Sequence, residues 1–240
     1  METGARHQVS GHAELARHLV DALGGRFSTE LGIDLDRSPA QVERWFLAAT
    51  LFGTRIPVAV AERTYRSLSD AGVHTITDAG ARTWDELVAL LDAGGYSRYD
   101  FRTATRLRDL ARAVRERHKG RVATLEAVSD PRALEAALDA LPGWGPTTVR
   151  IFLRELRGIW PGADPPLDER ALAAAEHLRL VAYGSVRAGA ALIAFATEAG
   201  VDMRDLEAAL VRLSLHHRSR AGCPGGAACV ALEARPAAAS

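Results

Sequence analysis

The feature that most constrains this chain is the segment at residues 141–148, which reads Leu-Pro-Gly-Trp-Gly-Pro-Thr-Thr. Apolar residues recur at helical spacing just before it, behind Asp130 as an expected N-cap and Pro131 at the first helical position. Pro142 cannot continue that helix, and the two glycines allow a tight reversal of the chain. Pro146 then begins a second amphipathic helix. The sequence therefore predicts a helix, a Gly-x-Gly hairpin and a helix over residues 131–157.

Such a hairpin favours anion binding. The free N–H groups of the glycine turn and of the second helix's first turn point outward together, and they form a small site for an anion. The alternative is an ordinary turn between helices, and Trp144 is compatible with either a core anchor or a contact to the minor groove. The candidate contact residues of this turn are Gly143, Trp144, Gly145, Thr147 and Thr148.

The rest of the chain predicts an all-α protein, because no alternating strand pattern occurs. Ser38 and Pro39 begin a helix whose interior, residues 45–52, is apolar nearly all round and is therefore expected to be buried. Thr83 and Glu86 form a capping box that opens another helix. Further helices are expected at 12–23, 56–68, 100–118, 168–178, 186–199 and 202–216.

Charge is distributed unevenly along the sequence. The formal net charge is zero, which argues against a protein that coats nucleic acid through bulk electrostatics. Residues 98–121, however, hold nine basic and three acidic side chains, a formal +6. This run indicates either a local basic face for DNA or merely a solvated helix surface. Its basic residues are Arg98, Arg102, Arg106, Arg108, Arg112, Arg115, Arg117, Lys119 and Arg121.

Composition and the chain start bear on location. Hydrophobic residues make up 48% of the chain, enough for a sizeable core, and no apolar run reaches membrane-spanning length. The first twelve residues are polar, and two cysteines fit a reducing compartment. A cytoplasmic, nucleoid-associated protein is expected.

One acidic residue further along the chain is a second feature that bears on function. Asp168 lies 25 residues after Gly143, within Pro-Pro-Leu-Asp-Glu-Arg. Together these features resemble the helix-hairpin-helix DNA glycosylase superfamily, which includes endonuclease III, over about residues 40–217. The resemblance implies two helical subdomains with a DNA-binding cleft between them, one formed by residues 39–179 and the other by 1–38 with 180–240. It also implies a monomer that binds double-stranded DNA.

The resemblance makes Asp168 the candidate catalytic residue, since cleavage of a glycosidic bond passes through an oxocarbenium-like state that a carboxylate stabilises. The alternative is the N-cap of the following helix, and both roles are compatible. Relatives that also cut the strand carry a lysine where this chain has Thr147. Lys119 is the only lysine of the sequence and lies elsewhere, so no lyase activity is expected.

Two further features of the family bear on this chain. Endonuclease III-like members hold an iron–sulfur cluster on the pattern C-x6-C-x2-C-x5-C, whereas this chain offers only Cys223 and Cys229. We therefore expect a lost cluster, no bound metal and no cofactor. A zinc site of the two cysteines with His216 or His217, or a local disulfide, stays open as an alternative.

Base flipping requires a side chain that fills the gap left in the duplex and a pocket for the base. The resemblance places the wedge in the loop at Phe52, Thr54 and Arg55, where Phe52 departs from the usual polar pattern and indicates an apolar wedge, a different target base or core packing. Residues of a second loop line the pocket in relatives and are candidates for stacking or for ordinary packing. They are Tyr96, Arg98 and Tyr99.

These features predict a monofunctional DNA base-excision repair glycosylase that hydrolyses the N-glycosidic bond of a damaged or mismatched base. The first alternative is a non-catalytic protein of the same fold that recognises distorted or damaged DNA. The second is an all-α protein unrelated to nucleic acid. Alkylated purines, oxidised pyrimidines, uracil and mismatched thymine all stay open as target bases.

Overall fold

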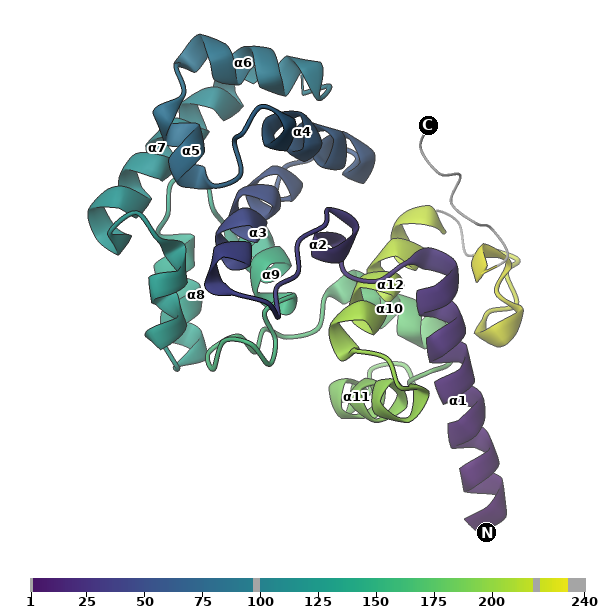
Figure 1. Cartoon of the computed structure of the whole chain (residues 1–240). Helices are drawn as coiled ribbons and strands as arrows, with labels where there is room; N and C mark the ends of the chain where they lie inside the picture. The colour runs from purple at the N-terminus through teal and green to yellow at the C-terminus, as the bar shows by residue number, and fades with distance from the viewer. Residues whose placement is uncertain (1, 97–99, 218–220, 233–240) are drawn as a thin grey trace. The chain divides into compact units, whose positions relative to one another are not determined.

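The computed structural model describes residues 2–96, 100–217 and 221–232, with side chains from residue 11 onward. These residues form twelve α-helices and three 3₁₀ helices, and they contain no strand (Figure 1). The prediction of an all-α chain is confirmed. None of the described helices combines the length and apolar character needed to cross a membrane.

The chain divides into two compact units. Residues 28–165 form one, which we call the central unit, and residues 1–27 with 166–240 form the other, the terminal unit. The expected division had the same interleaved order, with boundaries at 38/39 and 179/180. The observed boundary at 165/166 assigns the helix that follows Asp168 to the terminal unit, because that helix packs along the helix at 203–216.

The core of the central unit is α3, which contacts α4, α5 and α9 (Figure 1). Nine of its side chains are buried, as its continuous apolar sequence predicted. Its Trp45 Nε1 donates to the Phe152 carbonyl at 3.2 Å. The helices that begin in this part of the chain are α2 (Phe27–Glu30), α3 (Pro39–Phe52), α4 (Val58–Asp70), α5 (Ile76–Ala81), α6 (Trp84–Ala93), α7 (Asp100–His118), α8 (Pro131–Asp139) and α9 (Pro146–Arg154), with a 3₁₀ helix at Val122–Ala127.

One carboxylate is buried on α3. The Glu43 side chain is 8% exposed and its Oε1 accepts from the Ala123 amide at 2.8 Å, at the start of the 3₁₀ helix. Burial raises the pKa of Glu43, although the backbone amides of Ala123 and Val122 and the charge of Arg121 act in the opposite direction.

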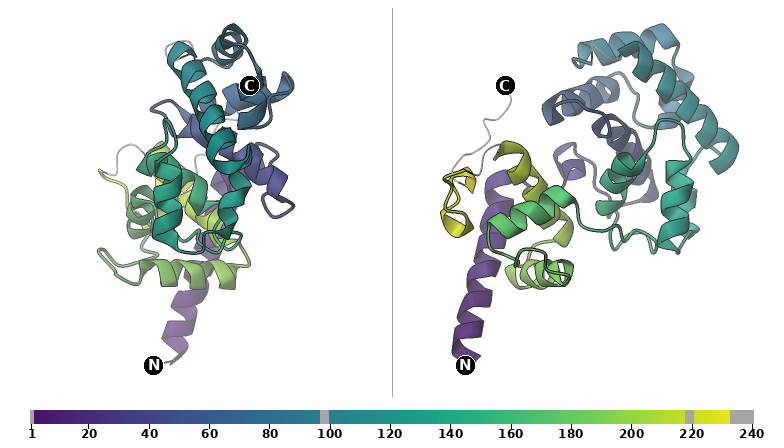
Figure 2. Two further views of the ribbon diagram at one scale, coloured as in Figure 1. Left: turned by 90° about the vertical axis from the view of Figure 1, so that its left-hand side faces the viewer. Right: turned by 180° about the vertical axis from the view of Figure 1, so that it is seen from behind.

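The terminal unit joins the two ends of the chain. Its α1 packs on α11 and α12, while α10 packs on α12. The last described segment, yellow in Figure 2, lies against α1 and α12. The elements of this unit are α1 (Glu2–Leu23), α10 (Glu169–His177), α11 (Ala188–Ala199) and α12 (Met203–His216), with 3₁₀ helices at Gly226–Ala228 and Val230–Leu232.

Local signals agree with the helices to differing degrees. The capping box of Thr83 and Glu86 forms with both of its hydrogen bonds, as predicted. Ser38 is the N-cap of α3, yet its side chain makes no capping hydrogen bond. Helix α5, which opens with a capping box of Thr75 and Asp78, was not predicted. The first helix was predicted to begin at residue 12, ten residues after the observed start of α1.

Candidate functional site

The predicted helix-hairpin-helix forms in the central unit from α8 and α9. Asp130 caps α8 by accepting from the Ala133 amide at 2.7 Å, and Pro146 lies in the first turn of α9. Gly143 has φ +77°, a left-handed conformation that favours glycine, and this reverses the chain. The turn is therefore built as its sequence indicated.

Trp144 anchors the hairpin in the core. Its side chain is 6% exposed, and its ring stacks on Phe46 at a centroid distance of 4.3 Å. Its Nε1 donates to Thr50 Oγ1 at 3.1 Å, so both the ring and its polar atom are held by α3. Of the two interpretations of Trp144, this geometry corresponds to the core anchor.

The start of α9 lies against the end of α3. Thr148 is buried, and its Oγ1 would lie 2.0 Å from a Cβ placed on Gly53, so only glycine permits this approach. Thr147 is exposed, and Gly145 has open space around it. The N-cap of α9 is Gly145, which has no side chain to cap the helix, and Pro146 has no N–H, so the first-turn amides without an intrahelical acceptor are those of Thr147 and Thr148.

Arg106 of α7 lies beneath the hairpin. A Cβ on Gly143 would lie 2.0 Å from Arg106 Cδ, so the absence of a side chain at residue 143 makes room for this arginine. Burial lowers the pKa of Arg106, and the neighbouring Tyr96 acts in the opposite direction. Arg106 Nε is buried and has no hydrogen-bond partner among the described residues. A half-buried guanidinium, whose Nη2 donates to the Thr50 carbonyl at 3.5 Å, thus lies close to the glycine turn.

A hollow of about 400 Å³ opens beside this arginine. It is bounded by the loop after α3 and by one face of α7. Arg55 and Arg102 are exposed at its rim, whereas Arg106 is half-buried. The hollow carries three positive charges and therefore suits an anionic ligand. Its lining residues are Gly53, Thr54, Arg55, Arg102, Thr103 and Arg106.

Of the other residues that were predicted for the wedge and the base pocket, the two that the structure describes do not line this hollow. Phe52 is partly exposed and lies near Trp45, with ring centroids 6.1 Å apart. Tyr96 is 1% exposed and its hydroxyl donates to the Leu51 carbonyl at 3.0 Å, so its ring is not available to stack on a base. Arg98 and Tyr99 lie outside the described residues.

The basic run forms α7 at the predicted bounds. Its apolar face is buried, while Arg102, Arg108, Arg112, Arg115 and Arg117 are exposed. Arg112 pairs with Asp109 at 2.6 Å, and Arg117 donates to the Ala140 carbonyl of the hairpin at 3.0 Å. The arginine face of α7 is thus exposed to solvent, and its first turns border the hollow. That this face binds DNA stays a prediction.

Asp168 lies in the terminal unit, whereas the hairpin lies in the central unit. It is the N-cap of α10, and its Oδ1 accepts from the Arg170 amide at 2.8 Å. Its own amide donates to Glu207 Oε1 at 3.0 Å, and Glu207 is buried in α12. Its role as a helix cap is therefore evident. Its catalytic role stays a prediction.

The terminal unit brings together four metal-ligating side chains, His177, His217, Cys223 and Cys229. Both cysteines and His217 belong to the zinc site expected as an alternative, whereas His177 was not predicted. His216, the other expected histidine, is not in the cluster, and its Nδ1 lies 2.9 Å from the Arg212 carbonyl oxygen. The sequence placed His177 in the last turn of a predicted helix. That position points to a metal ligand only once the packing of the helix against the segment after α12 is known.

No known family model matches the sequence, and no curated protein matches it.

Proposed function

We propose that this chain is a DNA base-excision glycosylase that releases a damaged or mismatched base and does not cut the strand. The observation that carries the proposal is the position of Arg106, which lies beneath Gly143 of the hairpin and also lines the hollow beside the loop after α3. The hairpin and the wedge loop, which the resemblance assigns to DNA binding, thus lie in the same unit as the basic helix.

The hairpin and the hollow together suit a phosphate backbone. The first-turn amides of α9 and the positive end of its dipole favour an anion. Arg55 and Arg102 add exposed charge within the same unit. Contacts of this kind position a duplex without reading its sequence. The proposed substrate is therefore recognised first through its backbone.

The proposed chemistry belongs to Asp168. Its carboxylate lies at the N-terminus of α10, where it accepts from the Arg170 amide, and a carboxylate can stabilise positive charge on the sugar or orient a water molecule. Thr147 occupies the position where a lyase would carry its lysine, and a hydroxyl cannot form a Schiff base. Hydrolysis without strand cleavage is the expected reaction.

The second candidate function is binding of distorted DNA without chemistry. The burial of Tyr96 favours it, because an aromatic ring that could have stacked on an extruded base is committed to the core. Arg98 and Tyr99 are the remaining members of the expected pocket loop.

The deciding experiment is single-turnover base release from duplexes that each carry one lesion: an alkylated purine, an oxidised pyrimidine, uracil or mismatched thymine. Hot alkali reveals abasic sites that the protein leaves uncut. We expect release from at least one duplex, and Asp168→Asn should slow it at least about 100-fold. Asp130→Asn is the matched control, because it changes another N-cap aspartate to a residue that caps equally well.

Measurement of affinity for duplex DNA distinguishes the two candidate functions from each other and from a protein that does not bind DNA. Arg102→Ala should weaken binding to all duplexes alike and should lower the slope of log affinity against log salt by about 1. Salt-dependent binding without release from any lesion would favour the binding protein. Release that is unaffected by Asp168→Asn would contradict the assignment of the acid, and an absence of duplex binding at low salt would refute both functions.

A further inference from the structure

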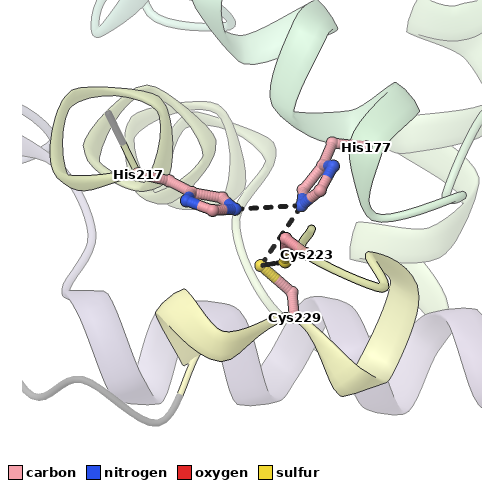
Figure 3. Close-up of side chains that lie close together, drawn as sticks. All are labelled: His177, His217, Cys223 and Cys229. Atoms are coloured by element: carbon pink, nitrogen blue, oxygen red, sulfur yellow. Dashed lines mark hydrogen bonds between the residues drawn. The ribbon is translucent and has the colours of Figure 1, made fainter. Parts of the chain in front are cut away.

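A cluster of two histidines and two cysteines lies in the terminal unit, remote in sequence from the hairpin (Figure 3). His177 is the last residue of α10, and His217 is the C-cap of α12. Cys223 and Cys229 flank the sequence Pro-Gly-Gly-Ala-Ala in the segment that follows. One ligand atom from each side chain lies within 4.8 Å of all the others. Three separate segments thus direct nitrogen and sulfur atoms to one point.

All six separations among these atoms are at most 4.8 Å, and three of them match the edges of a tetrahedron around one zinc ion. Zinc bonds of about 2.3 Å to sulfur and about 2.0–2.1 Å to nitrogen imply edges of about 3.8 Å between sulfurs, 3.6 Å between sulfur and nitrogen, and 3.3 Å between nitrogens. The sulfurs of Cys223 and Cys229 are 3.7 Å apart. His177 Nε2 is 3.5 Å from Cys229 Sγ and 3.1 Å from His217 Nε2. All three separations agree within about 0.2 Å.

Other uses of these residues fit less well. A disulfide requires sulfurs about 2.05 Å apart, and both cysteines are free. A two-iron cluster with histidine ligands places its two histidines on one iron and its two cysteines on the other. Here one nitrogen is as close to a thiol sulfur as ligands of a shared ion would be. A set of two sulfurs and two nitrogens in tetrahedral arrangement is typical of zinc.

We propose that His177, His217, Cys223 and Cys229 bind a single structural zinc ion. The donor set differs from four cysteines around an iron–sulfur cluster, and it does not depend on the function proposed for the hairpin. All four positions of the tetrahedron are filled by protein, so no position is open for water or substrate, and the ion has no catalytic step of its own.

The backbone around the cluster favours a cation and holds the loop in place. Both histidines lie at helix C-termini, where the helix dipole favours positive charge. Gly225 has φ +67°, and a Cβ there would lie 2.5 Å from the His177 carbonyl oxygen, so glycine permits the loop to approach α10. Arg179, at φ +56°, donates from its guanidinium to the Pro224 carbonyl at 3.1 Å. The site is thus supported by contacts beyond its four ligands.

The zinc would fasten the segment after α12 to the ends of two helices. Without it, this segment is held by the hydrogen bond from Arg179 and by the packing of Cys229, Ala231 and Leu232. Metal ligands of a structural site contribute directly to folding free energy. The expected role is therefore to stabilise the terminal unit.

The test begins with the full chain, produced without a histidine tag in zinc-supplemented medium and analysed by metal mass spectrometry. We expect one zinc per chain. Removal of zinc by a chelator should lower the melting temperature, and added Zn²⁺ should restore it. Co²⁺ in place of zinc should give the visible absorption of a tetrahedral site with thiolate ligands. These measurements need no variant and therefore do not depend on the folding of one.

Single variants then assign the ligands. His177→Ala and Cys229→Ser should each reduce bound zinc to background, whereas His216→Ala, at the exposed neighbouring histidine, should retain one zinc per chain. Protein that contains no zinc and takes up neither Zn²⁺ nor Co²⁺ would refute the proposal. So would bound iron in place of zinc, a Cys223–Cys229 disulfide found by thiol titration, or equal zinc content in His177→Ala and the unaltered chain.

Discussion

The central and terminal units assemble their polar groups in opposite ways. In the central unit, eight consecutive residues at 141–148 form the hairpin. The core beneath it determines only which of these residues are buried and which are exposed. In the terminal unit, three of the four candidate zinc ligands lie within residues 217–229, and the fourth, His177, lies 40 residues before His217. A site of the first kind can be read from sequence, whereas the ligand set of the second kind is complete only when helices are packed.

The two regions also differ in what holds them. The hairpin is held by aromatic packing of Trp144 on Phe46 and Phe152, that is, by burial of hydrocarbon. The cluster contains little hydrocarbon and consists of four groups that can ligate one ion. A change in one region should therefore leave the other intact, and this independence can be tested.

The largest effect is expected from Trp144→Ala, which removes a buried aromatic ring and leaves Thr50 Oγ1 without its donor. It should lower the free energy of unfolding of the central unit by about 3–5 kcal/mol. All four tryptophans of the chain lie within residues 28–165, so tryptophan fluorescence during urea denaturation follows this unit.

The matched control is Phe101→Ala, because Phe101 is 60% exposed and should cost about 1 kcal/mol or less. Zinc bound by the terminal unit should be the same in both variants. A loss of zinc in Trp144→Ala under native conditions would show that the two regions are not independent.

An intermediate effect is expected from Gly53→Ala. The backbone there has φ −67°, which any residue adopts, but the new Cβ would lie 2.0 Å from Thr148 Oγ1. Overpacking of this kind should cost about 1–3 kcal/mol, as measured by the same denaturation. Gly145→Ala, with no atom within 4 Å of its Cβ, should change stability by about 0.5 kcal/mol or less.

A double-mutant cycle identifies the cause. In a Thr148→Gly background the three nearest atoms are gone, so Gly53→Ala should cost much less. An unchanged cost in that background would mean that the end of α3 and the start of α9 are not in the described contact.

The smallest effect concerns pH. Burial raises the pKa of Glu43 above its ordinary value of 4.5, so its contribution to stability is fully present below about pH 4.5 and is lost as pH rises through the folded-state pKa. Stability of the unaltered chain minus that of Glu43→Gln should therefore fall with rising pH and then level off. Denaturation at several pH values measures this difference, and a difference that rises with pH would contradict the burial of the ionised group.

How far the sequence could be interpreted follows from the distance between interacting residues. The Thr83–Glu86 capping box and the glycine turn were predictable because their partners lie within a few residues. The two uses of Trp144 could not be separated, since its burial depends on Phe46, about a hundred residues away. His177 was missed for the same reason, because His217 lies 40 residues further along the chain. The short α5 was missed because aspartate replaces glutamate in its capping box.

One feature of the terminal unit connects its two candidate roles. The amide of Asp168 contacts Glu207 at one end of α10, and His177 contacts His217 at the other, so α10 and α12 run in the same direction and are joined at both ends. Nine residues of helix separate Asp168 and His177 by about 13 Å. Hydrogen exchange along α10 should therefore begin at the histidine end when zinc is removed. The first amide with an intrahelical acceptor, that of Leu172, which donates to the Asp168 carbonyl at 2.9 Å, should stay protected longest.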